Sequence, residues 1–222
     1  MEKIAPTKEW SVALRWNHWL MALTIVALIP TGYYIAAPFT IYAGDTVNKM
    51  FMGDVRFWHI LFGVILVFLF IWRIYLAFFS RFHADWRDFG ACLNRKNVYK
   101  QVCYYAFISR EPPEHTHLYG PLQAVAYAGL LFMVVLVLLT GLILMGAGYD
   151  AGLTALVYML VKPIENWMGG LAMVRWIHHI LMWGFILFIV VHIYMAVWYD
   201  IVFKEGTISS MISGVVFRHS HD

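Results

Sequence analysis

Four apolar stretches, each long enough to cross a lipid bilayer as a helix, constrain this 222-residue chain more than any other feature. A spanning helix needs about 20 predominantly apolar residues, because the hydrocarbon core of a bilayer is about 30 Å thick. The stretches run from about residues 12–35, 55–79, 122–145 and 174–199. With 62% hydrophobic and 13% charged residues, the composition excludes a soluble enzyme. The sequence therefore predicts an all-α integral membrane protein, a bundle of four transmembrane helices.

The connections between these stretches are predicted to add amphipathic helices and no further crossing. The connection at 149–170 has an apolar run of only about 11 residues, ended by Lys162 and Pro163, which is too short to span the membrane. We expect a helix there that lies at the surface or caps the bundle, with a fifth crossing as the less favoured alternative. A second helix is expected within residues 97–114, ended by Glu111-Pro112-Pro113. Residues 1–222 then form a single membrane domain.

Lysine and arginine are distributed unevenly between the two sides that four crossings define. The side with both termini and the second connection holds twelve of the 16 Lys and Arg residues. The other side holds only Lys49, Arg56, Lys162 and Arg175. An excess of positive charge marks the cytoplasmic side, so we expect both termini to be cytoplasmic. No nucleic-acid motif is present, and no nucleic-acid partner is expected.

Histidines occur inside the predicted spans, where ionisable groups are costly and usually functional. Three of them end the same pattern, Arg-aromatic-x-His, which reads RWNH, RFWH and RWIH. Arg and His at this spacing share a helix face, with the Arg one turn nearer the membrane surface. An imidazole can bind a haem iron, and a guanidinium can bind a haem propionate. The candidate propionate contacts and ligands are Arg15, Arg56, Arg175, His18, His59 and His178.

A fourth histidine, His192, shares the last stretch with His178 and His179. Because a helix turns about 100° per residue, His192 lies about 40° from His178 around the axis but about 140° from His179. His178 and His192 therefore share a face, about 21 Å apart along the axis. His179 points elsewhere, and its role stays open.

Depth in the membrane sorts the four histidines into two pairs, His59 with His178 and His18 with His192. Each pair suits a bis-imidazole iron centre in the interior of a helix bundle. Zinc also accepts imidazole, but two histidines without a thiolate or carboxylate fit a zinc site poorly. The alternative of a different class is a haem-free proton-conducting or anchoring membrane protein, in which the histidines titrate.

Small residues occur near two outer helix ends, at Thr31-Gly32 and Thr140-Gly141. A missing side chain lets a planar macrocycle approach the backbone. Ordinary packing of small residues between membrane helices is the alternative explanation.

At these residues the chain resembles a known family, the di-haem cytochrome b subunits of membrane-bound nickel–iron hydrogenases. More distantly, it is similar to the gamma subunit of respiratory formate dehydrogenases. The resemblance covers roughly residues 10–215 and includes GPLQ before the third stretch and the histidines 14 apart in the fourth. TISSMISG near the C-terminus favours the hydrogenase branch. Relatives often carry Trp-His-Arg where this chain has Ile177-His178-His179.

The resemblance implies a multi-pass protein of the bacterial inner membrane with two haem b groups. His59 and His178 would hold the outer haem, and His18 and His192 the inner haem. A periplasmic hydrogenase, with a large and a small subunit, would oxidise hydrogen. Electrons would then pass from the iron–sulfur clusters of the small subunit through both haems to a quinone, for which we expect menaquinone. The chain would act as the electron-transferring and quinone-reducing subunit, without splitting hydrogen itself.

The resemblance also implies contact with a C-terminal membrane helix of the small subunit. The alternative partner is another periplasmic dehydrogenase or reductase, such as formate dehydrogenase.

The approach to the third stretch, HTHLYGPLQ, carries polar groups at the predicted cytoplasmic edge of the membrane. Side chains of this kind can hydrogen-bond a quinone carbonyl or pass a proton. The quinone-binding candidates are His117, Tyr119 and Gln123. The alternative is that they anchor the membrane interface next to a helix that starts at Pro121.

Overall fold

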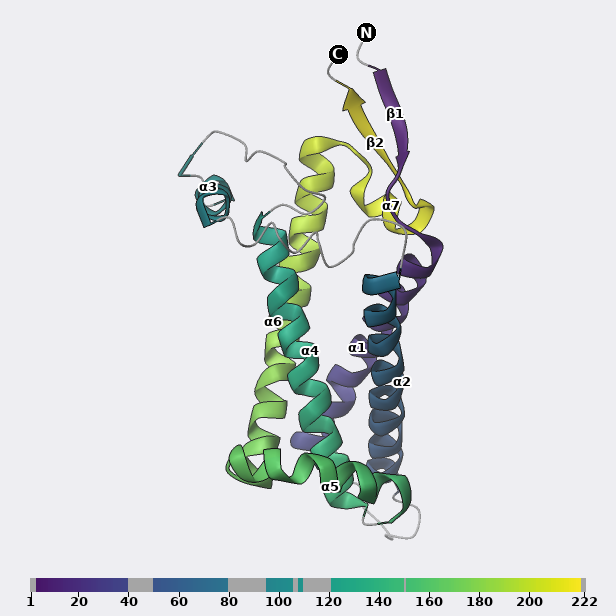
Figure 1. The fold of residues 1–222 in the computed structure, drawn as a ribbon, viewed down its shortest axis with the longest axis vertical. Coiled ribbons are helices and arrows are strands. Elements are labelled where there is room, and N and C mark those ends of the chain that lie inside the picture. The colour runs from purple at the N-terminus through teal and green to yellow at the C-terminus, as the bar shows by residue number, and fades with distance from the viewer. Residues whose placement is uncertain are drawn as a thin grey trace. The chain divides into compact units, whose positions relative to one another are not determined.

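The computed structural model describes residues 3–39, 50–79, 95–105, 108–109, 121–149 and 151–220. Along the chain, these residues form two short strands and seven helices (Figure 1). The elements are β1 (Lys3–Lys8), α1 (Val12–Ala36), α2 (Phe51–Phe79), α3 (Arg95–Tyr105), α4 (Pro121–Gly148), α5 (Gly152–Trp167), α6 (Leu171–Phe203), α7 (Thr207–Ser213) and β2 (Val215–Ser220).

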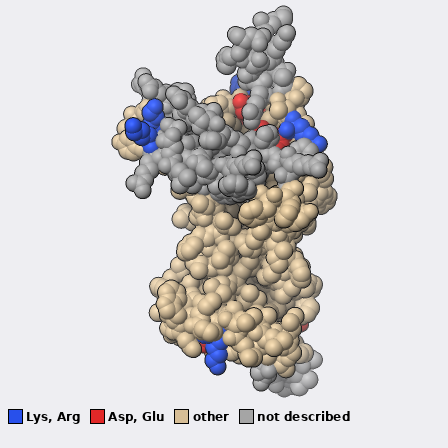
Figure 2. All heavy atoms as spheres, in the orientation of Figure 1, with Lys and Arg blue, Asp and Glu red and all other residues tan. Residues whose placement is uncertain are grey.

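The four predicted transmembrane helices are confirmed as helices by α1, α2, α4 and α6. Within the described residues, these four are long and apolar enough to cross a membrane. A helix forms the hydrogen bonds of its backbone N–H and C=O groups internally. A segment in the bilayer core needs this, because no water is there to bond these groups. Three helices are longer than predicted by four residues or more, because α2 starts at Phe51, α4 runs from Pro121 to Gly148 and α6 runs from Leu171 to Phe203. In the view of Figure 2, the flanks of the helices are free of charged residues, which gather near the helix ends.

The chain divides into two compact units, and each of the four long helices contributes to both. The first unit comprises Met1–Asn17, Ile71–Phe132 and His192–Asp222. The second unit comprises His18–Phe70 and Met133–Val191.

The first unit contains a two-stranded sheet that the all-α prediction missed. Strands β1 and β2 pair antiparallel, with Lys3 opposite Ser220 and Lys8 opposite Val215. Figure 1 shows β1 and β2 side by side. The pairing joins segments more than 200 residues apart, so no local hairpin pattern in the sequence could predict it.

Helix α7, formed by most of TISSMISG, is tied to the start of α1 in the same unit. It is flanked by Gly206 and Gly214, whose φ angles are 73° and 86°. The indole of Trp10 donates a hydrogen bond to the buried Ser210 hydroxyl at 3.1 Å. Arg15 donates from Nη1 to the backbone carbonyl of Ile212 at the end of α7. A cation at a helix C-terminus satisfies carbonyls that have no partner within the helix.

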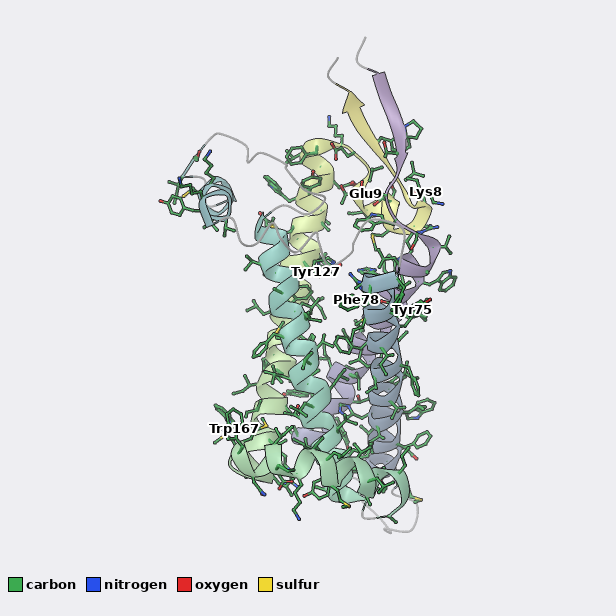
Figure 3. All side chains as sticks on the ribbon, in the orientation of Figure 1. Lys8, Glu9, Tyr75, Phe78, Tyr127 and Trp167 are labelled. Atoms are coloured by element: carbon green, nitrogen blue, oxygen red, sulfur yellow. The ribbon has the colours of Figure 1, made fainter. Side chains whose placement is uncertain are left out.

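Aromatic side chains also mark the end of α2 in the first unit. Tyr75 and Phe78, labelled in Figure 3, are both exposed. Aromatic residues at such positions are typical of the boundary between lipid and water. Helix α3 confirms the amphipathic helix expected in the second connection, although it ends at Tyr105. The predicted stop at 111–113 lies outside the described residues.

In the second unit, α5 lies crosswise at the ends of α4 and α6 (Figure 1). It has 16 residues and continues through Pro163 to Trp167, so the short helix is confirmed but extends past the predicted Lys162-Pro163 break. A Cβ on Gly146 would lie only 2.7 Å from the Cβ of Tyr158, so this glycine is what lets α5 approach α4. The Tyr158 hydroxyl donates to the carboxylate of buried Glu165 at 2.7 Å. Trp167 at the end of α5 points away from the unit and is 88% exposed (Figure 3).

Candidate functional site

Two of the predicted iron ligands meet in the second unit. His59 lies on α2 and His178 on α6, and their ring centroids are 6.3 Å apart. The ring planes make an angle of 75°. The residues are 119 positions apart in sequence, and matched depth in the membrane was the reason to pair them. The structure brings the two rings together, and their binding of one iron stays a prediction.

Each of these histidines has a threonine partner on the helix that precedes its own among the four long helices. Thr31 of α1 places its Oγ1 3.0 Å from Nδ1 of His59. Thr140 of α4 places its Oγ1 2.8 Å from Nδ1 of His178. The site therefore consists of two half-sites of the same design, one from α1 and α2 and the other from α4 and α6.

The direction of these hydrogen bonds follows from the second bond that each hydroxyl makes. Thr31 donates to the carbonyl of Ala27 at 2.9 Å, and Thr140 donates to the carbonyl of Leu136 at 2.8 Å. A hydroxyl has one hydrogen to donate. With that hydrogen directed at the helix backbone, the hydroxyl oxygen is left to accept from an Nδ1–H, and this is the tautomer that the geometry favours. The Nε2 lone pair of each ring is then available to a metal.

A glycine follows each of the two threonines and lies against the same histidine. A Cβ on Gly32 would lie 3.0 Å from Cε1 of His59, and a Cβ on Gly141 would lie 3.5 Å from Cε1 of His178. The absence of a side chain therefore makes room for the imidazole in each half-site. Both Thr-Gly pairs are visible in the sequence, but their hydrogen bonds to histidine are not.

The residues at this site fit a haem iron with two axial imidazoles. An imidazole nitrogen binds a metal at about 2 Å and lies about 1 Å from the ring centre, so axial rings have centres about 6 Å apart. The observed distance of 6.3 Å agrees with this value. Within the part of the chain that the structure describes, no group of three or more His, Cys, Asp or Glu residues could hold a metal ion.

The other predicted pair is divided between the two units. His18 belongs to the second unit, where its ring meets that of Trp19 edge-on at 5.3 Å. His192 lies on the part of α6 that belongs to the first unit. Their pairing therefore stays a prediction.

His179 has a contact of its own that separates it from its neighbour His178. The indole of Trp183, one turn further along α6, donates to Nε2 of His179 at 3.4 Å. The same Trp183 meets Tyr33 of α1 edge-on at 6.4 Å. His179 is thus part of an aromatic contact between two helices, and the sequence argument that placed it off the face of His178 agrees with this position.

The predicted propionate contacts occupy different surroundings. Arg56 and Arg175 are exposed near the starts of α2 and α6, about one turn before His59 and His178. Arg15 lies in the first unit and is held by the Ile212 carbonyl and by Gly214, where an added Cβ would come 3.3 Å from Cζ of the arginine. Propionate binding by all three stays a prediction.

Of the quinone-binding candidates, His117 and Tyr119 lie outside the described residues, and Gln123 lies in the first turn of α4. The predicted helix start at Pro121 is confirmed.

Four long apolar helices and a pair of facing imidazoles define a class, the multi-pass membrane proteins with a site suited to a bis-histidine haem. A family model described as prokaryotic cytochrome b561 matches residues 9–214 of the chain. The chain belongs to this family, and membership implies haem b as its cofactor. The resemblance stated from the sequence is thereby confirmed at the level of the family.

Several relatives share about 30% of their residues with the chain over most of its length. The chain is 33% identical to a protein of Bradyrhizobium diazoefficiens, over 92% of this chain and 83% of the relative. It is also 33% identical to a protein of Azotobacter vinelandii, over 92% of this chain and 86% of the relative. Both carry the name "Probable Ni/Fe-hydrogenase B-type cytochrome subunit". An Escherichia coli K12 protein named "Probable Ni/Fe-hydrogenase 1 B-type cytochrome subunit" is 28% identical, over 95% of this chain and 87% of the relative.

Proposed function

We propose that this chain is the di-haem b subunit of a Ni/Fe hydrogenase complex, conducting electrons from the hydrogenase to the quinone pool. The observation that carries the proposal is the facing pair of His59 and His178, each with its Nδ1 engaged by a threonine. The names of the relatives support hydrogenase as the partner.

In this proposal, His59 and His178 would hold the iron of the outer haem, and His18 and His192 would hold that of the inner haem. When bound, haem b supplies reversible one-electron transfer. His59 and His178 would offer Nε2 to the iron, because Nδ1 of each ring lies against a threonine hydroxyl. Arg15, Arg56 and Arg175 offer positive charge to the propionates.

The proposed setting is the bacterial inner membrane, with both termini cytoplasmic and residues 1–222 acting as one membrane domain. Each long helix contributes to both units, which supports a single domain. The proposed partners are the large subunit and the small subunit, including the C-terminal membrane helix of the latter. Menaquinone is the proposed acceptor, at a site near His117, Tyr119 and Gln123.

A spectroscopic experiment on the native complex tests this function. The complex is purified through a tag on this chain, its haem is quantified as the pyridine haemochrome, and its subunits are identified. The proposal predicts two b haems per chain, copurification with hydrogenase subunits, and haem reduction by hydrogen followed by reoxidation on adding a menaquinone analogue. Absence of haem would favour the haem-free alternative, and copurified formate dehydrogenase would replace the proposed partner.

A further inference from the structure

We propose that Thr31 and Thr140 are positioning residues that fix the rings of His59 and His178 and set how strongly each imidazole donates electrons to iron. The inference rests on the proposed function, because it takes these two histidines as axial ligands. It assigns the threonines a role that an ordinary helix-packing residue would not have.

Each threonine hydroxyl is held in place by backbone carbonyls of its own helix. Thr31 is within hydrogen-bond distance of the carbonyls of Ala27 and Leu28, at 2.9 and 3.0 Å. Thr140 has the same arrangement with Leu136 and Val137, at 2.8 and 3.1 Å. These bonds fix the position of Oγ1 on its helix, so each threonine offers a hydrogen-bond acceptor at a defined point.

The hydroxyl oxygen in turn holds the imidazole in orientation. An Nδ1–H bonded at 3.0 Å in one half-site and 2.8 Å in the other selects one tautomer and fixes rotation about the ring's attachment. The adjacent glycines leave the space that the rings occupy. In each half-site the threonine bond at Nδ1 and the glycine next to Cε1 therefore come from adjacent residues of one helix.

These bonds are strong enough to change iron chemistry. Thr140 is 0% exposed, so its bond to His178 does not compete with water. An acceptor on Nδ1–H increases electron density at Nε2 and raises ligand basicity. A more basic ligand stabilises ferric over ferrous iron, so losing the bond is expected to raise the midpoint potential of the haem.

The chain offers a matched control on α1. Thr24 is also buried and donates to the carbonyl four residues earlier, Leu20, at 2.7 Å. Its hydroxyl makes the same backbone bond as Thr31 and Thr140. The three threonines thus share the bond to the carbonyl four residues earlier, and Thr31 and Thr140 are the ones bonded to the paired histidines.

The experiment compares Thr31→Val and Thr140→Val with Thr31→Ser, Thr140→Ser and Thr24→Val in the purified complex. Valine keeps the shape and removes the hydroxyl, whereas serine keeps the hydroxyl and removes a methyl group. Haem content, the midpoint potential of each haem, and the low-spin ferric EPR signals are measured. The inner haem serves as an internal reference in every variant.

The expected result is an upward shift in the outer haem's potential in both valine variants, with altered EPR g values. A tenfold change in the ratio of reduced to oxidised haem corresponds to about 59 mV for one electron, and we expect a shift of up to about this size. The serine variants and Thr24→Val should retain the wild-type potential. Loss of the outer haem in the valine variants but not in the serine variants would also support the inference.

Unchanged potentials and EPR signals in both valine variants would overturn the inference, as would equal effects of valine and serine. Neither outcome contradicts the proposed function, provided that the wild-type complex holds two b haems. If His59→Ala leaves the outer haem intact, by contrast, the ligand assignment itself fails. The two failures are therefore distinguishable within one set of variants.

Discussion

Gly32 lies so close to His59 that a Cβ on the glycine would come within 3.0 Å of Cε1 of the imidazole. The corresponding distance in the other half-site, from Gly141 to His178, is 3.5 Å. A separation of 3.5 Å is ordinary van der Waals contact, whereas 3.0 Å requires a neighbour to move. The two half-sites therefore have the same arrangement of residues, but the glycine lies closer to the imidazole of His59 than to that of His178.

This difference predicts that Gly32→Ala and Gly141→Ala have unequal effects. Gly32→Ala should displace the ring of His59 and weaken outer haem binding about tenfold, which is a typical cost of disturbing a ligand's support. Gly141→Ala should retain the haem. Haem titration of the apoprotein measures both affinities, and Gly53→Ala is the control, because nothing lies within 4 Å of a Cβ there. A larger loss in Gly141→Ala than in Gly32→Ala would contradict this reading.

A second prediction separates the adjacent histidines of α6. His179→Ala should leave both haems in place, because its Nε2 accepts a hydrogen bond from Trp183. His192→Ala should remove the inner haem alone. Reduced-minus-oxidised spectra of the two variants check both statements. Two normal haems after loss of His192, or a missing haem after loss of His179, would show that the assignment on α6 is wrong.

The docking of α5 is predicted to depend on pH. The hydrogen bond from Tyr158 to Glu165 raises the Tyr158 pKa above its usual value of about 10, and desolvation and the carboxylate charge act in the same direction. A group whose pKa is raised in the folded state stabilises the fold below its unfolded pKa. That contribution is lost as the pH rises through the folded value.

Tyr158→Phe should therefore lower the melting temperature of the complex at pH 7 by a few degrees and remove part of its decline above about pH 10. Tyr149→Phe is the matched control, since Tyr149 is exposed. Thermal unfolding between pH 7 and pH 11 gives both profiles. Parallel profiles for wild type and Tyr158→Phe would show that this bond makes no contribution.

The link between α7 and the start of α1 predicts a sensitive glycine. Gly214 has φ 86°, and an added Cβ would lie 2.9 Å from the carbonyl oxygen of Trp10. Gly214→Ala should therefore destabilise the protein by about 1–2 kcal/mol from the left-handed backbone alone, and by more from the contact. Gly129→Ala, with open space at its Cβ, should cause no loss. Equal melting temperatures for the two variants would count against this explanation.

The sequence predicted the helical part of the fold because apolar length is a local property. Stretches of more than 20 apolar residues have few alternatives to a membrane helix, and α1, α2, α4 and α6 follow them closely. The β1–β2 ribbon could not be predicted in this way. Its pairing depends on contact between the two ends of the chain, and Pro6 lies inside β1.

The candidate site was predictable to the extent that helix geometry determines it. The turn per residue separated His178 from His179, and depth in the membrane paired His59 with His178. The hydrogen bonds from Thr31 and Thr140 were not predictable, because they depend on how far α1 and α4 stand from their neighbours. The repeated Thr-Gly pairs were the only feature of the sequence that pointed to these hydrogen bonds.

Haem content of His59→Ala, His178→Ala and the double variant tests most directly whether these two residues bind the same iron. Pyridine haemochrome assays of the purified complex give the number of haems per chain. Our account predicts that each single variant and the double variant lose the same single haem and keep one. A double variant that loses two haems, where each single variant loses one, would show that His59 and His178 serve different haems.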